Sequence, residues 1–351
     1  MVLLAVLRLN GGTNNSLRNI TIQSTDKILT QVLRLGEEGL ETNDSEEKIF
    51  GFISSIAFDA VGDILVVDTK IRNLRKFSNT GRFIWEFSKE GRGPGEIMAA
   101  TLVKAANDWI FVYDLGNRKI VRYDRSMVFQ EEFIVPRALL GMNMTKQGDI
   151  YGSGVSFKPY SFERHHIIVM DSTGQLKKTF GGEIELDVSH VTKDRLKWLV
   201  YDYYAGWIGL SIWNDKLLAS PIYDSHTFVY TLDGKFLSRF KNPDFRYKLL
   251  NYTVRERSVR YPLYETRAGT AIGLSDQYIL KGYQVSKEEG HIQYYLDVFD
   301  AQGKVVKSQI PINGILMDVF QKGNLIVTTS FHPFPQLWVY RVELDQLENK
   351  R

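Results

Sequence analysis

Two carboxylates recur in register in the first half of the chain, and paired carboxylates are able to do chemistry. When Asp68 is aligned with Asp114, Arg72 falls opposite Arg118 without a gap. Such acids could hold calcium at a channel rim or act as general bases. In the structural alternative, each carboxylate accepts backbone N–H groups or pairs with its arginine. Recurrence favours the structural alternative, because a catalytic acid is needed once whereas a loop-closing acid is needed in every repeat.

The other residue types that usually carry catalysis are sparse or badly spaced. The sequence has six histidines without a zinc-binding spacing, no cysteine and no GxSxG nucleophile motif. The glycines of "GRGPGE" at 91–96 would permit a phosphate cradle, but the helix and the Lys-Ser/Thr pair of such loops are missing. We therefore expect no catalytic residue and no metal site. We interpret 91–96 as a rigid turn whose Arg92 and Glu96 contribute to the surface.

One insertion, at 183–207, is rich in aromatic side chains. Its residues Tyr203, Tyr204 and Trp207 could form a stacking surface for a sugar or a peptide. Alternatively, they pack the insertion, including a short helix expected around 192–203, onto the rest of the fold.

A second insertion, at 242–268, is basic and includes Arg260. It holds six basic residues against three acidic ones, with tyrosines and a phenylalanine between them. This composition suits an anionic partner and also an ordinary solvated loop. Single-stranded nucleic acid is the weaker interpretation of the interleaved aromatics.

A repeating pattern of strands must position these residues. Strands with apolar and polar residues in alternation recur in units of about 40 to 50 residues. Tight hairpin tips separate the first two strands of six units: Gly62-Asp63, Asn107-Asp108, Gly148-Asp149, Asn214-Asp215, Asp276-Gln277 and Gly323-Asn324. Four-residue turns that follow the third strands begin at Ser78, Asp124, Asp171, Thr231 and Asp300. The Asp124 turn lacks the glycine of the others.

The sixth unit has no fourth strand before the chain reaches Arg351, whereas 27–36 resembles the isolated fourth strand at 82–91. A strand supplied by 27–36 would complete the last unit and close a ring, which covers the sheet edges. We therefore predict an all-β fold: a six-bladed β-propeller of four-stranded antiparallel blades over 27–351. Residues 1–26 are expected to be a leader or an extra strand. Two unrelated β-sandwiches are the less favoured alternative.

The unit resembles the NHL-repeat and related bacterial six-bladed β-propellers. The resemblance rests on the spacing of Asp68, Arg72 and Phe77, on the same spacing from Asp114, and on "GRGPGE", and it is clear over 53–136. Some similar propellers are calcium-dependent lactonases or lyases, and animal relatives bind protein or nucleic acid. Many bacterial relatives are extracytoplasmic. The resemblance implies a periplasmic or cell-surface location, with the cytoplasm as the alternative.

The two faces of such a ring differ in their connections. Turns after the first and third strands of each blade form the short-turn face, and loops after the second and fourth strands form the long-loop face. The long and variable connections are at 153–164, 183–207, 242–268, 283–291 and 330–336. Because binding usually resides in variable loops on a rigid scaffold, we predict binding on the long-loop face. The candidate residues are Asp68, Arg72, Arg92, Glu96, Asp114, Arg118, Tyr203, Tyr204, Trp207 and Arg260.

Composition narrows the partner class. A net charge of +3 over 351 residues provides no global field for nucleic acid, and no apolar segment is long enough to span a bilayer. The predicted function is non-enzymatic recognition of a protein, peptide or glycan, without a cofactor. The alternative is a calcium-dependent lactonase, hydrolase or lyase with the metal in the central channel.

Overall fold

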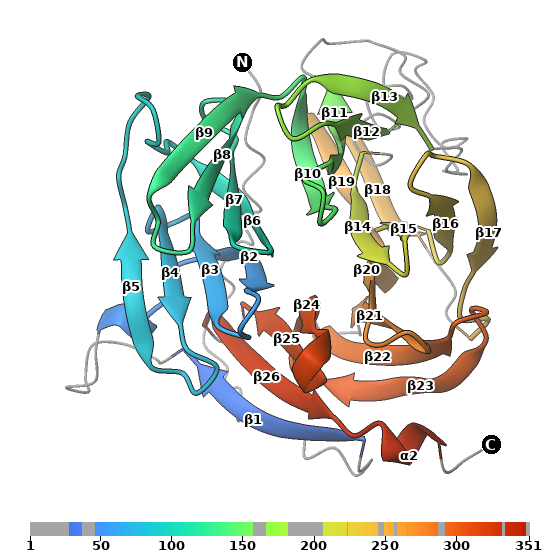
Figure 1. Cartoon of the computed structure of the whole chain (residues 1–351). Helices are drawn as coiled ribbons and strands as arrows, with labels where there is room; N and C mark the ends of the chain where they lie inside the picture. Colours follow the sequence, from blue (N-terminus) through green and yellow to red (C-terminus); the bar gives the residue numbers. More distant parts are fainter. Residues whose placement is uncertain are drawn as a thin grey trace.

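The computed structural model confirms the all-β six-bladed propeller: six four-stranded antiparallel sheets stand in a ring (Figure 1). The structure describes residues 28–36, 46–156, 166–181, 206–222, 224–244, 249–255, 258–264, 266–286, 292–331 and 334–348. The first strands of neighbouring blades contact one another around the ring, so they are the innermost strands. The expected leader at 1–26 lies outside the described residues.

The first three blades follow chain order from the inside outwards. Blade 1 contains β2 (Ile53–Phe58), β3 (Ile64–Asp68), β4 (Asn73–Phe77) and β5 (Phe83–Phe87). Blade 2 contains β6 (Ala100–Ala106), β7 (Trp109–Asp114), β8 (Lys119–Asp124) and β9 (Phe129–Ile134). Blade 3 contains β10 (Arg137–Met144), β11 (Ile150–Ser156), β12 (Ile167–Met170) and β13 (Leu176–Phe180).

The last three blades include the closure of the ring. Blade 4 contains β14 (Ile208–Trp213), β15 (Lys216–Pro221), β16 (Thr227–Thr231) and β17 (Phe236–Phe240). Blade 5 contains β20 (Thr266–Gly273), β21 (Tyr278–Ser286), β22 (Ile292–Asp300) and β23 (Val305–Ile312). Blade 6 contains β24 (Ile315–Phe320), β25 (Leu325–Ser330), β26 (Gln336–Val342) and, as its outer strand, β1 (Leu29–Leu35). Strand β1 pairs antiparallel with β26, which confirms the predicted closure.

The predicted tips and turns lie between the strands that they were expected to join. All six hairpin tips connect first and second strands, and all five turns connect third and fourth strands. In the turn without glycine, Met127 itself takes the left-handed conformation, with φ of 61°. The long connections need three corrections. The connection at 153–164 begins as the end of β11. The insertion at 242–268 contains a two-stranded sheet of β18 (Leu249–Arg255) and β19 (Ser258–Tyr264), and the connection at 283–291 begins as strand.

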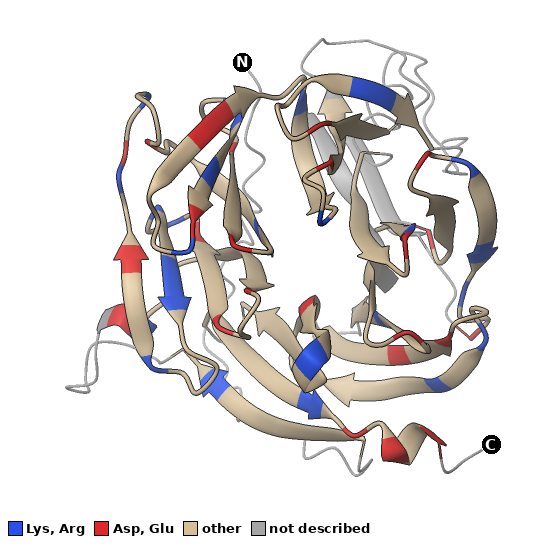
Figure 2. Ribbon diagram, in the orientation of Figure 1, with Lys and Arg blue, Asp and Glu red and all other residues tan. Residues whose placement is uncertain are grey.

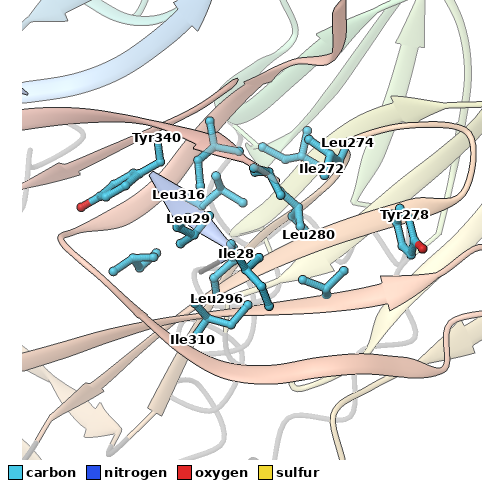
Figure 3. Packing of buried hydrophobic residues seen from close by; sticks show 14 of the residues in the cluster. Ile28, Leu29, Ile272, Leu274, Tyr278, Leu280, Leu296, Ile310, Leu316 and Tyr340 are labelled. Carbon is cyan, nitrogen blue, oxygen red and sulfur yellow. The ribbon is translucent and has the colours of Figure 1, made fainter. Parts of the chain in front are cut away.

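Apolar residues between the blades form the core, and the contact between blades 5 and 6 shows how closure is stabilised (Figure 3). Ile28 and Leu29, just before and within β1, are buried against Leu316 of β24, Leu296 of β22 and Tyr340 of β26. Fully burying a side chain of this size is worth about 1.5–3 kcal/mol. The N-terminal strand therefore contributes apolar burial as well as hydrogen bonds. Within the described ranges, no helix has the length and apolar character needed to cross a membrane.

Candidate binding face

Asp68 ends the second strand of blade 1 and fixes two loops of the long-loop face. Its side chain is fully buried, and its Oδ2 and Oδ1 accept the N–H groups of Gly51 at 2.5 Å and Phe52 at 2.9 Å. The Oδ1 atom also accepts from the N–H groups of Lys70 and Ile71, each at 3.0 Å. One carboxylate thus ties the entry of the blade to the loop after its second strand.

Asp114 plays the same part in blade 2, where it is also fully buried. It accepts the N–H groups of Met98 at 2.9 Å and Ala99 at 2.8 Å, and the Nδ2 of Asn117 at 2.7 Å. These hydrogen bonds are those of the structural alternative for both aspartates. Both carboxylates are occupied by the N–H groups of their own loops. This geometry therefore favours a structural role over direct contact with a ligand.

The two arginines that recur with the aspartates share an unusual backbone conformation. Arg72 and Arg118 both lie in the left-handed region, with φ of 62° and 55°, at the end of the loop that leads into the third strand. The Arg72 guanidinium pairs with Glu90 at 2.8 Å, not with Asp68. That exposed pair joins the loop after β3 to the connection between blades 1 and 2, and both arginines lie at the surface.

The segment 91–96 is a tight connection, and side chains of blade 2 bind its backbone. This is the arrangement that the rigid-turn interpretation expects. The Glu96 carboxylate accepts the N–H of Gly93 at 2.8 Å, which occupies Glu96 within the turn. Gly95 needs its positive φ of 68°, and its N–H donates to Glu132 at 3.1 Å. Lys119 donates to both the Gly93 carbonyl and the Glu132 carboxylate. Arg92 is exposed on this turn.

Three apolar side chains gather on the same face where blade 1 meets blade 6. The rings of Phe52 and Phe331 stack with their centroids 4.7 Å apart and an interplanar angle of 8°. Phe52 and Ile71 are each 43% exposed. We call Phe52, Ile71 and Phe331 the apolar anchors. Sequence analysis missed them, because Phe52 and Phe331 come from opposite ends of the chain and a lone exposed isoleucine has no distinctive spacing.

The aromatic and basic candidates of the insertions can be placed only in part. Tyr203 and Tyr204 and the helix expected at 192–203 lie outside the described residues. Trp207 is half-buried directly before β14, where its carbonyl accepts the N–H of Ile222 at 2.9 Å. Arg260 lies in β19, and its side chain is outside the description. Their part in binding stays a prediction.

The junction between blades 4 and 5 contains a buried lysine that sequence analysis also missed. Lys281 of β21 is fully buried and donates from Nζ to the carbonyls of Ser225 at 2.8 Å and His226 at 3.2 Å. Its cross-strand neighbour Asp297 accepts from Asn242 at 2.6 Å and from the N–H of Gln309 at 2.8 Å. The signal in the sequence was a lysine inside the apolar run of a second strand.

Burial shifts the protonation equilibria of this pair. It lowers the pKa of Lys281 from 10.5 to about 7, although the charges of Asp224 and Asp297 oppose the shift. It also raises the pKa of Asp297 from 3.8 to about 6, against the hydrogen bonds from Asn242 and Gln309. Both groups therefore titrate near neutral pH. Since both side chains are closed off from solvent, they brace the junction and are not presented to a ligand.

In the described ranges, no group of three or more histidine, aspartate or glutamate side chains is placed to hold a metal ion. The calcium alternative stays a prediction. The arrangement instead offers a stiff rim on which apolar and basic side chains are exposed.

Solved structures with this architecture agree on the fold. A predicted exported protein of Bacteroides fragilis aligns with a TM-score of 0.56 at 12% identity, over 92% of this chain and 98% of that chain. A DUF4221 family member from Bacteroides vulgatus aligns with a TM-score of 0.55 at 10% identity, over 90% of this chain and 98% of that chain. At such identities the likeness shows the fold alone. A gluconolactonase of Xanthomonas campestris aligns at a TM-score of only 0.46, with 14% identity over 84% and 87% of the two chains, and carries no argument about activity.

Sequence comparison gives the family. No curated protein matches the chain. The family DUF5128, described as a 6-bladed beta-propeller, matches residues 13–223, which is more than half of the chain. That description agrees with the six blades of the structure. The chain therefore belongs to the DUF5128 family of six-bladed β-propellers.

Proposed function

We propose that this propeller is a non-catalytic binding protein that recognises a segment of another protein with the blade 1 part of its long-loop face. The observation that carries the proposal is the exposure of Phe52 and Ile71, each 43%, on backbone that Asp68 holds in place. The N–H groups of both residues donate to the same buried carboxylate oxygen. Exposed apolar groups on a fixed backbone are what a recognition hot spot requires.

Rigidity supports binding at this face. A ligand that docks on a preordered loop avoids much of the entropy cost of ordering that loop. The stacking of Phe52 on Phe331 also fixes the orientation of the Phe52 ring, and it joins blade 1 to the connection after the second strand of blade 6. An isolated exposed apolar residue needs no explanation, but Phe52 and Ile71 are exposed on backbone bound to one carboxylate oxygen, and neighbouring exposed apolar groups are typical of an interaction surface.

The aliphatic anchor favours a peptide over a glycan. Sugars are held mainly by flat aromatic faces with hydrogen-bonding groups around them, whereas Ile71 offers only a branched aliphatic surface. One face of the Phe52 ring is already covered by Phe331. These features suit apolar side chains of a protein segment.

We further propose that the protein acts outside the cytoplasm. Support comes from the structural likeness to the predicted exported protein of Bacteroides fragilis. The likeness concerns the fold, so localisation by fractionation with an antibody to the native protein is the direct check.

A matched pair of variants tests the proposed face. Ile71→Ser removes an anchor on the long-loop face. The matched control, Val61→Ser, removes another exposed β-branched aliphatic side chain, 55% exposed, on the short-turn face of the same blade. Peptides are selected from a displayed random library on the immobilised wild-type protein, and a glycan array is probed in parallel. We expect enriched peptides whose affinity falls about tenfold with Ile71→Ser and is unchanged with Val61→Ser.

Three outcomes would contradict the proposal. Equal losses with both variants, or none with either, would place recognition elsewhere. Enrichment on the glycan array without any selected peptide would assign the face to sugars.

A further inference from the structure

The exposed charges on the loops that follow the second and fourth strands of blades 1 and 2 are mostly positive. The described segment that leads into Phe52 adds Glu47 and Lys48, both half-buried and of opposite charge. In blades 1 and 2, which the structure describes completely, the loops after the second and fourth strands expose five basic residues and one acidic residue. The basic residues are Lys70, Arg72, Lys89, Arg92 and Arg118, and the acidic residue is Glu90. On the loop that leaves β5, the blue of basic residues alternates with the red of acidic ones (Figure 2), and Lys89, Glu90 and Arg92 are the exposed charges there. We call these five residues the basic rim.

Contacts between loops hold the basic rim beside the anchors. Lys70 and Ile71 are neighbours in the chain, and both N–H groups bind Asp68. Arg72 reaches the next connection through Glu90. The turn that carries Arg92 is bound to blade 2, because Asn117 donates to the Gly91 carbonyl at 2.9 Å. The positive groups are therefore spread along one continuous, fixed stretch of the face.

This concentration contrasts with the whole chain and with the opposite face. The net charge of the protein is only +3, so the basic rim is a local feature. On the short-turn face of the same blades there are fewer exposed positive charges: Arg82 is exposed, Arg125 is paired with Asp108 at 2.6 Å, and Lys76 lies buried between Asp59 and Asp63. Local excess of one charge attracts and orients a partner of the opposite charge.

We propose that the partner segment is acidic: a peptide whose apolar side chains contact the anchors and whose flanking Asp or Glu residues meet the basic rim. This inference rests on the proposed function and adds the chemistry of the segment. An anionic partner without apolar groups, such as a nucleic acid, would leave Ile71 and the exposed face of Phe52 uncovered. The combination of aliphatic and cationic groups at one site is best matched by an acidic peptide.

The test compares three synthetic peptides that share one apolar core, taken from a selected library peptide, and carry glutamate, serine or lysine flanks. Fluorescence anisotropy measures their affinity for the wild-type protein at low and high NaCl concentration. We expect the glutamate form to bind at least about tenfold more tightly than the lysine form at low salt, and the gap to narrow at high salt.

Charge-reversal variants locate the effect. Lys70→Glu combined with Arg92→Glu should remove or reverse the preference for the glutamate form, since both side chains are exposed at the surface of the long-loop face. The control is Arg82→Glu, an exposed residue beside the Ser78 turn on the short-turn face, which should leave the preference unchanged. Circular dichroism confirms that each variant is folded.

The outcomes separate the two proposals. If the three peptides bind equally, or if Arg82→Glu acts as strongly as the rim variants, the acidic-segment inference is overturned. The proposed function would still stand if all three peptides lose affinity with Ile71→Ser. If Ile71→Ser has no effect on any of them, both proposals fail.

Discussion

The region where the chain enters blades 1 and 2 and the junction between blades 4 and 5 satisfy buried backbone groups with opposite chemistry. In the first, buried carboxylates at the ends of β3 and β7 accept N–H groups of the loops. In the second, the buried ammonium group of Lys281 donates to carbonyls of the loop after β15. Both regions lie towards the long-loop face, and both satisfy backbone groups that would otherwise be buried without partners.

The difference decides which region presents side chains to a partner. The loop after β3 keeps its backbone bound to Asp68, so Lys70, Ile71 and Arg72 are all exposed. In the loop after β15, the described residues are buried or half-buried, and Asp224 binds the ring of His226 at 2.7 Å. The first region is therefore suited to recognition and the second to bracing.

The largest expected effect comes from breaking the buried pair of blade 5. Blade 2 has Val112 and Val121 at the equivalent cross-strand position, so charge is not required there by the fold. Asp297→Val should destabilise the protein by about 3 kcal/mol, because Asn242 and Gln309 lose their acceptor and Lys281 loses a compensating charge. Urea unfolding measures the change.

The double variant Lys281→Val with Asp297→Val sharpens the same comparison. We expect it to be less destabilised than the sum of the two single variants, since it removes both buried ionisable groups together. Strict additivity would mean that the two residues do not interact, and the account of this junction would be wrong.

Removing the carboxylate of blade 1 should have a somewhat smaller effect. Asp68→Ala leaves the N–H groups of Gly51, Phe52 and Ile71 without their acceptor, which is expected to cost about 2 kcal/mol. Peptide affinity should fall as well, because the anchors lose their fixed backbone. The control Glu90→Ala removes only an exposed ion pair and should change stability by less than about 0.5 kcal/mol. Unchanged peptide affinity in folded Asp68→Ala would show that preordering of this loop is unimportant.

A further expected effect is a pH dependence that originates in blade 5. Since the folded-state pKa of Lys281 is about 7, below its ordinary 10.5, its contribution to stability increases as pH rises from 7 towards 10.5. Since the folded-state pKa of Asp297 is about 6, above its ordinary 3.8, its contribution decreases as pH rises from 3.8 to 6. Relative to the double valine variant, the wild-type protein should be least stable between pH 6 and 7.

Differential unfolding curves of the wild-type protein and the double valine variant across this range provide the measurement. The difference should change by up to about 1 kcal/mol per pH unit on either side of the minimum. A difference that does not vary with pH would indicate that neither group has the shifted pKa.

The blades could be predicted from the sequence because their signals are local. Each hairpin tip needs residues that accept a left-handed or tight conformation, and Gly62, Asn107 and Asn324 supply it with φ of 88°, 53° and 49°. The sixth unit shows only three strand patterns, and the segment 27–36 resembles a fourth strand, so closure of the ring by an N-terminal strand could also be predicted. The hairpin of β18 and β19 was also encoded locally, in the alternation around Tyr252 and Val259, but the high density of charged residues in that insertion is equally typical of a solvated loop.

The site could be predicted only in part because its contacts join distant segments. The recurring Asp68 and Asp114 were recognised as structural candidates, but the ion pair of Arg72 with Glu90 depends on how two loops approach. The stacking of Phe52 on Phe331 joins residues that are 279 positions apart in the sequence, so no local spacing indicates it. The burial of Lys281 depends on the neighbouring blade, which no spacing within blade 5 reveals.

Photo-cross-linking of a selected peptide, mapped by mass spectrometry on the wild-type protein, tests the central claim most directly. The account predicts cross-links within 69–72 and 88–96 and at Phe52 or Phe331, on the long-loop face of blade 1 and its neighbours. Cross-links at the hairpin tips 59–63 and 107–108 or at the turn 78–81, on the short-turn face, would contradict it.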